Sequence, residues 1–170
     1  QNLRSGTVGS DIFPASFSTR QKQLQNFIRM FEENRERWSE AIQADLKQNP
    51  LLTFTEVDSS IHEAKYLLLN LKTLMKDSGV RISNAVPQTC SAVFHPEPLG
   101  LVLIISPWNY PISLLAKPLS GAIAAGNAVV AKPSPKAPLA AARLRELALK
   151  AGWPADLFQV VHGAAEAALS

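Results

Sequence analysis

A run of five consecutive apolar residues, 101–105, constrains the fold of this 170-residue chain more than any other feature. Gly100 precedes the run, and Ser106 and Pro107 follow it. Five aliphatic residues without polar alternation are typical of a strand that is buried on both faces, as in a parallel sheet. The run therefore predicts a parallel sheet, in which helices connect successive strands.

The residues after this run continue the alternation of helix and strand. They predict a helix over 112–125, a strand over 128–131, a helix over 137–150 and a strand over 157–161. Strand–helix–strand–helix–strand is the beginning of a doubly wound parallel sheet. The predicted fold class is therefore α/β, with an incomplete Rossmann-like sheet in the second part of the chain.

The first part of the chain predicts helices instead. Ser18 and Gln21 have the spacing of a capping box, and apolar residues at helical spacing follow as far as Asn49-Pro50, with a kink or short break at Asn34. A second helix is predicted over 55–77, and Gly79 is well placed to terminate it. Charged residues are denser in this part, so we divide the chain into a helical segment, 1–90, and an α/β unit, 91–170.

Composition excludes several classes of function. The single cysteine excludes an intramolecular disulfide framework and a multi-cysteine zinc site, and the histidines lack metal-ligand spacing, so no metal is expected. Lys and Arg are spread along the chain, which argues against a nucleic-acid partner. No apolar run approaches the roughly 20 residues that span a bilayer, so no membrane partner is expected. With no secretory signal visible, these features predict a reducing, cytoplasmic location.

Candidate site residues follow the predicted strands, because ligands of an open parallel sheet bind beyond the carboxyl ends of its strands. Asn109 follows the first strand. Its amide can stabilise a developing oxyanion, or it can cap the next helix, which spacing alone favours. Lys132 ends the second strand, where it can bind a phosphate or a ribose hydroxyl, or be an ordinary surface lysine. His162 follows the third strand.

Residues 98–111 resemble the signature segment of the aldehyde dehydrogenase superfamily. The segments 118–119, 121–127 and 129–134 continue that resemblance at matching spacing. The helical part, from Arg20 to Met75, is similar to the class-three branch of the superfamily. The dense match over 98–134 makes an unrelated nucleotide-binding module a poor alternative.

The resemblance implies an enzyme that oxidises aldehydes to carboxylic acids with NAD or NADP, through a cysteine thiohemiacetal. Asn109 matches the asparagine that holds the oxyanion, and Lys132 matches the lysine that binds the adenosine ribose. The remaining implied cofactor-binding residues are Ile105, Ser106, Pro107, Trp108 and Ser134. The class-three branch implies medium- or long-chain aliphatic and aromatic aldehydes as substrates, and a homodimer for the complete protein.

One departure from the family pattern concerns the cofactor. The family commonly has a glutamate directly after its Lys-Pro-Ser triplet, where it accepts hydrogen bonds from ribose hydroxyls, and this chain has Pro135 there. Losing that carboxylate weakens NAD recognition and removes repulsion against a 2′-phosphate. Lys136 next to it can favour NADP.

A second departure concerns the catalytic groups. In the family, the nucleophilic cysteine, the general base and the glycine turn at the pyrophosphate lie further along than Ser170. Cys90 precedes the first strand of the sheet, and Glu97 and Glu166 do not match the family base. We therefore expect the chain alone to be inactive. The alternative is a truncated, non-catalytic product with a residual nucleotide-binding or subunit-contact role.

Overall fold

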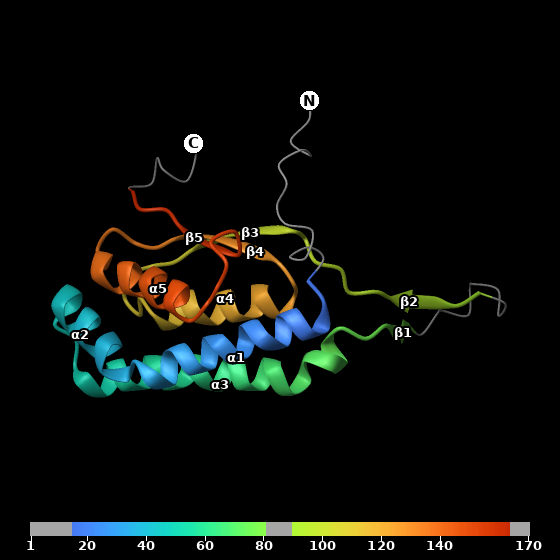
Figure 1. Cartoon of the computed structure of the whole chain (residues 1–170), viewed down its shortest axis with the longest axis horizontal. Coiled ribbons are helices and arrows are strands. Elements are labelled where there is room, and N and C mark those ends of the chain that lie inside the picture. Colours follow the sequence, from blue (N-terminus) through green and yellow to red (C-terminus); the bar gives the residue numbers. More distant parts are fainter. Residues whose placement is uncertain (1–14, 81–89, 164–170) are drawn as a thin grey trace, which may run out of the picture.

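The structure is a computed structural model that describes residues 15–80 and 90–163, arranged in layers (Figure 1). The helices are α1 (Phe17–Glu33), α2 (Arg35–Leu46), α3 (Pro50–Leu74), α4 (Ser113–Ala124) and α5 (Pro138–Lys150). The strands are β1 (Ser78–Val80), β2 (Ala92–Phe94), β3 (Leu101–Ile105), β4 (Ala128–Lys132) and β5 (Phe158–Val160). We call α1, α2 and α3 the helical layer.

The strands β3, β4 and β5 form a parallel sheet in that order, with Ile105 of β3 paired to Lys132 of β4. The chain moves across the sheet in one direction, and right-handed crossovers then place both connecting helices on the same face. Figure 1 shows α4 and α5 below the sheet, and α1 and α3 below α4. The predicted fold class, a helical segment followed by parallel strands and helices, is confirmed.

Burial on both faces, which we predicted for residues 101–105, is wrong for these described residues. Ile104 faces the helices and is 7% exposed, whereas Leu101, Leu103 and Ile105 are more than half exposed on the opposite face. β4, in contrast, is buried on both faces, because almost all of its consecutive residues are buried. The reason is topological: α4 and α5 cover one face only, and β3 has a described neighbour on one side only.

The helical layer begins two residues before the predicted capping box. Ser16, not Ser18, is the N-cap of α1, and its hydroxyl accepts a hydrogen bond from the Thr19 backbone N–H at 3.2 Å. The predicted break at Asn34 is confirmed, because α1 ends at Glu33 and α2 starts at Arg35.

Asn49-Pro50 starts a helix, where we predicted that it would stop one. α2 already ends at Leu46, followed by Lys47 in the left-handed region at φ 52°. Asn49 then caps α3 by accepting from the Leu51 N–H at 2.9 Å, and Pro50 occupies the first turn, where its missing N–H costs nothing. The helix predicted over 55–77 therefore begins five residues earlier.

The C-terminal end of α3 was also predicted wrongly. α3 ends at Leu74, so Gly79 is not its terminator and lies in β1 instead. β1 pairs antiparallel with β2 in a two-stranded ribbon that the sequence analysis did not predict. Glu166, which does not match the family base, lies outside the described residues.

Aromatic side chains join the helical layer to the α/β unit. Phe31 stacks on Phe27 and on Trp38, with ring centroids 4.7 Å apart in both pairs. Phe27 also stacks on Trp153, which meets Phe158 of β5 edge-on. One continuous core therefore runs from α1 and α2 to the sheet.

A buried arginine fixes the contact between α1 and the end of α4. The Arg20 guanidinium donates to the carbonyls of Ala15 at 2.8 Å and Ala124 at 3.3 Å. Gly126 lies against this guanidinium at φ 88°, and a Cβ there would approach the Arg20 Cζ to 2.5 Å. Both the left-handed backbone and the close approach require glycine at this position.

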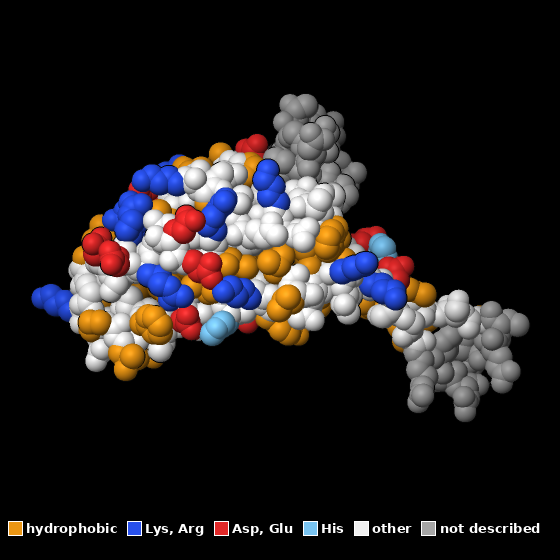
Figure 2. Space-filling view, turned by 60° about the horizontal axis from the view of Figure 1, so that its bottom comes forward, with side chains coloured by type: hydrophobic (Ala, Val, Ile, Leu, Met, Phe, Trp, Pro, Cys, Tyr) orange, Lys and Arg blue, Asp and Glu red, His pale blue; other side chains and the backbone are white. Residues whose placement is uncertain are grey.

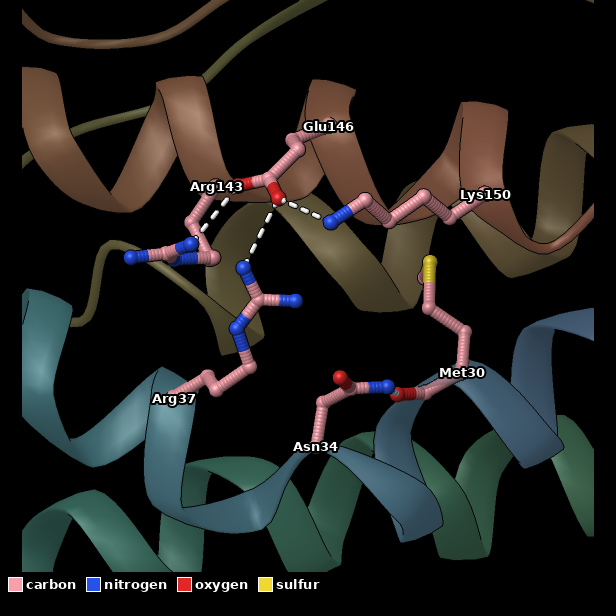
Figure 3. Close-up of polar contacts among 6 residues, drawn as sticks. All are labelled: Met30, Asn34, Arg37, Arg143, Glu146 and Lys150. Atoms are coloured by element: carbon pink, nitrogen blue, oxygen red, sulfur yellow. Dashed lines mark hydrogen bonds and ion pairs between the residues drawn. The ribbon is translucent and has the colours of Figure 1, made fainter.

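Charged side chains of both signs are interspersed over the outer face of the helical layer (Figure 2). The densest ion-pair cluster joins α2 to α5 (Figure 3). There the Glu146 carboxylate oxygens pair with side-chain nitrogens of Arg37 of α2 at 2.7 Å, Arg143 at 2.6 Å and Lys150 at 2.7 Å. Hydrogen bonds from Lys150 and Arg37 lower the pKa of Glu146 to about 2.

Replacing this carboxylate will remove an acid-dependent part of the stability. A lowered pKa means that ionised Glu146 stabilises the fold above the ordinary value of 4.5, and that this contribution is lost as the pH falls toward about 2. In Glu146→Gln we expect the free energy of unfolding to be lower near neutral pH and to fall less over this range. Urea unfolding at successive pH values measures both effects. Glu40→Gln, an exposed position on α2, is the control, and an identical acid dependence in Glu146→Gln and wild type would contradict the prediction.

Candidate functional site

The carboxyl ends of the parallel strands form one rim of the sheet. The Ser106 N–H donates to the Lys132 carbonyl at 3.2 Å, which continues the β3–β4 pairing into the loop after β3. We name residues 106–112 rim loop one and residues 133–137 rim loop two. The two loops predicted to carry the site therefore start side by side.

Lys132 is a buried residue and not the ordinary surface lysine that we weighed as an alternative. It is 7% exposed, and it makes no hydrogen bond or ion pair with the described residues. Register pairing places its side chain on the same side of the sheet as Ile105. A lysine at the rim that has no anionic partner among the described residues suits a ligand with hydroxyl or phosphate oxygens.

The side chains of rim loop one differ in exposure: the first one is buried, and the next three are exposed. Ser106 is buried, and its Oγ has no hydrogen-bond partner among the described residues. Pro107, Trp108 and Asn109 are exposed, so the Asn109 amide is free to meet a ligand at the rim. Asn109 does not cap the next helix, because α4 starts at Ser113 with Ile112 as its N-cap.

The first turn of α4 is capped by a carboxylate from α3. Glu56 Oε2 accepts from the backbone N–H groups of Ile112 at 3.0 Å and Ser113 at 3.1 Å, and Glu56 is 2% exposed. Burial raises the pKa of Glu56, and the hydrogen bonds from the Ser113 and Ile112 N–H groups offset part of that rise. Sequence reasoning missed this residue, although a charge among the apolar positions of an amphipathic helix was a visible signal.

Rim loop two is held in a similar way. Asp45 of α2 accepts from the Leu139 N–H at 3.2 Å and the Ala140 N–H at 2.8 Å, in the first turn of α5. Within the loop, the Ser134 hydroxyl accepts from the Lys136 N–H at 3.3 Å. Asp45 was also missed, because nothing local to its helix distinguishes it from a solvated carboxylate.

A cation–π contact joins the two rim loops. The Lys136 ammonium lies 5.2 Å from the centre of the Trp108 ring. Pro135, at the position where we expected the family glutamate, is exposed between Ser134 and Lys136. The structure thus brings Trp108 and Lys136 together at one edge of the rim.

Comparison with known proteins identifies the family. The model of the aldehyde dehydrogenase family matches residues 12–170. This chain belongs to the aldehyde dehydrogenase family. Aldehyde dehydrogenase family 3 member B1 of Bos taurus is 44% identical over 135 residues, which are 79% of this chain and 28% of that relative. The chain thus spans about 28% of the length of this family-3 relative.

Solved structures of the family share this fold. A substrate-bound Staphylococcus aureus AldH has a TM-score of 0.82 and 30% identity, over 90% of this chain and 33% of that one. A glyceraldehyde-3-phosphate dehydrogenase of Methanocaldococcus jannaschii, solved with NADP, has a TM-score of 0.73 and 26% identity, over 89% of this chain and 33% of that one. The arrangement of the helical layer and parallel strands is therefore that of aldehyde dehydrogenases.

Residues 15–80 and 90–163 contain neither a metal site nor a membrane-spanning helix. In these ranges no group of three or more His, Cys, Asp or Glu side chains is placed to hold a metal ion. No helix in the same ranges is both long and apolar enough to cross a membrane. Cys90 is exposed and lies two residues before β2 of the two-stranded ribbon, not on the rim.

Replacing Glu56 by glutamine will change how stability depends on pH. Because the folded pKa of Glu56 is raised above 4.5, its contribution to the free energy of unfolding is present below that value and is lost as the pH rises through the folded pKa. Glu56→Gln keeps an oxygen acceptor for α4 without a titrating proton. We therefore expect the free energy of unfolding of Glu56→Gln, relative to wild type, to increase as the pH rises from 4.5 through the folded pKa of Glu56.

Chemical denaturation at a series of pH values measures this difference. Glu63→Gln, an exposed position on the same helix, controls for general charge effects. A difference between Glu56→Gln and wild type that stays constant with pH would contradict the raised pKa.

Proposed function

We propose that this chain forms the N-terminal part of an NAD(P)-dependent aldehyde dehydrogenase that oxidises aldehydes to carboxylic acids. The observation that carries the proposal is that Asn109 of rim loop one and Lys132 at the end of β4 lie at one rim, in a chain of this family. The family-3 relatives support a class-three-like enzyme. Medium- or long-chain aliphatic or aromatic aldehydes are its proposed substrates. A homodimer is proposed for the complete protein.

The rim has the chemistry to hold a dinucleotide. The Lys132 side chain is 7% exposed and has no hydrogen bond or ion pair with the described residues, and the Ser106 Oγ is a buried hydroxyl without a partner among them. Under this proposal, Lys132 donates to ribose hydroxyls of the adenosine, and Ser134 contributes at the same end. Ile105, Ser106, Pro107 and Trp108 line the nicotinamide end. The bound cofactor supplies the hydride acceptor.

Asn109 is proposed to stabilise the oxyanion that forms when a thiolate attacks the aldehyde carbonyl. The amide donates a hydrogen bond without changing its own charge, and proline neighbours on either side of residues 108–110 limit the backbone freedom of the loop. A donor that is already in place stabilises developing charge without reorganising during the reaction. The nucleophilic cysteine and the general base are proposed to lie in the rest of the complete protein.

Removing the Asn109 amide tests the proposed function. In the full-length protein that contains this chain, Asn109→Ala should lower kcat for aldehyde oxidation by about 10²–10³-fold, the usual effect of losing one oxyanion donor. NAD(P)H formation with a panel of aldehydes is the measurement, and Asn70→Ala on α3 is the control. The 170-residue chain alone should show no turnover. Absence of aldehyde oxidation by the full-length wild type would refute the proposed function.

The cofactor preference is a separate prediction. We propose that Pro135 and Lys136 favour NADP, because the missing carboxylate no longer repels a 2′-phosphate and the nearby ammonium attracts it. Lys136→Ala should weaken NADP binding by about twofold to fivefold, as expected for an exposed charge pair, and leave NAD binding unchanged. Lys76→Ala, an exposed lysine at the end of α3, is the control. Calorimetric titration with both nucleotides decides the question, and a clear preference of the wild type for NAD would exclude it.

A further inference from the structure

Neither of the two helices behind the rim loops caps its own N-terminus. The N-cap residues, Ile112 of α4 and Ala137 of α5, make no side-chain hydrogen bond to the first turn. Neither first turn contains an acidic residue. Because the first backbone N–H groups of a helix have no intrahelical acceptor, both helices need one from elsewhere.

The helical layer provides an acceptor for each helix. Glu56 of α3 receives the Ile112 and Ser113 N–H groups at 3.0 Å and 3.1 Å. Asp45 of α2 receives the Leu139 and Ala140 N–H groups at 3.2 Å and 2.8 Å. Both carboxylates also place negative charge at the positive end of a helix dipole, which is favourable.

Each of these contacts lies where a rim loop ends. Rim loop one is fixed at its start by the Ser106–Lys132 backbone hydrogen bond, and at its end by Glu56. Asn109 lies between these two points and has no side-chain hydrogen bond to the described residues, so its position depends on both. Rim loop two likewise lies between the end of β4 and the Asp45 contact.

We propose that Glu56 and Asp45 are positioning residues for two different parts of the candidate site. Glu56 sets the place of Asn109 through the start of α4, and Asp45 sets the place of Ser134 and Lys136 through the start of α5. The roles of those loops rest on the proposed function. The positional claim itself concerns only residues of this chain.

A cap from a neighbouring layer fixes the helix start relative to that layer, which a local cap cannot do. A serine or aspartate at position 112 or 137 would satisfy the same N–H groups, but it would leave the helix start free to shift relative to the helical layer. Glu56 and Asp45 instead attach each helix start to α3 or α2. Their loss should therefore displace a specific loop in addition to lowering stability.

Hydrogen exchange on the full-length protein tests the positional claim without any activity. In Glu56→Ala, the exchange of the Ser106, Ile112 and Ser113 amides should increase about fivefold to tenfold, the effect of losing a cap, while the Ala137, Leu139 and Ala140 amides stay unchanged. Asp45→Ala should show the reverse. Glu56→Gln and Asp45→Asn retain an acceptor and should restore most of the wild-type protection. Ser16→Ala removes the cap of α1 and should leave both rim loops unchanged.

Kinetics then separate positioning from stability. Glu56→Ala should lower kcat for aldehyde oxidation by about 10- to 100-fold, since small displacements of a catalytic group have effects of that size. Its nucleotide affinity should fall less than that of Asp45→Ala, because rim loop one holds only the nicotinamide end of the proposed cofactor site. Asp45→Ala should weaken nucleotide binding by about fivefold and lower kcat at saturating cofactor much less. If Glu56→Ala and Asp45→Ala only lower the melting temperature, with exchange increased over the whole chain and kcat and nucleotide affinity intact, the positional claim is overturned.

The two proposals fail in different ways. A full-length wild type without aldehyde oxidation would refute the proposed function, while the exchange pattern would still decide the roles of Glu56 and Asp45. An active wild type in which Glu56→Ala and Asp45→Ala affect both loops equally would refute the inference and leave the proposed function in place.

Discussion

The starts of α4 and α5 need hydrogen-bond acceptors that their own sequences do not provide, and carboxylates of the helical layer supply them. This dependence ties the α/β unit to the layer beneath it. The parallel sheet places its loops at one rim by topology alone, but the end of each loop is set by a residue more than fifty positions earlier in the chain. The aromatic stack from Phe31 to Trp153 and Phe158 then keeps the layers in contact. The family match from residue 12 onward covers both layers, as this dependence requires.

A buried carboxylate such as Glu56 adds little net stability. The free energy needed to remove its charge from water offsets much of the free energy that its hydrogen bonds contribute. The raised pKa of Glu56 shows that burial outweighs the hydrogen bonds that favour the charged form. A short apolar side chain with a local cap on α4 would satisfy the same backbone groups at less cost. The benefit of Glu56 therefore lies in geometry: it fixes the start of α4 against α3, next to the loop that carries Asn109.

The elements that the sequence predicted well depend on local patterns. Strand 101–105, the helices after it and the break at Asn34 were predicted because apolar periodicity and turn residues specify them within a few positions. The β1–β2 ribbon was missed, since strands of three exposed residues carry no such pattern. Glu56 and Asp45 were missed for a different reason: each contact joins distant parts of the chain, and a local pattern gives no partner for either carboxylate. Strand order could predict that Asn109 and Lys132 lie at one rim, but not the groups that hold the rim loops, and the roles of the site residues stay predictions.

The face of β3 that the helices leave uncovered bears on the same site. Ile105 lies on this face, and its register partner Lys132 points to the same side, although Ile105 is exposed and Lys132 is buried. The difference arises because β4 has a described neighbour on both sides and β3 has one. A ligand that reaches the Lys132 ammonium from the rim therefore passes the apolar side chain of Ile105. Under the proposed function, this arrangement lets one nucleotide bury apolar surface on β3 and satisfy the charge on β4, two effects that neither strand could provide alone.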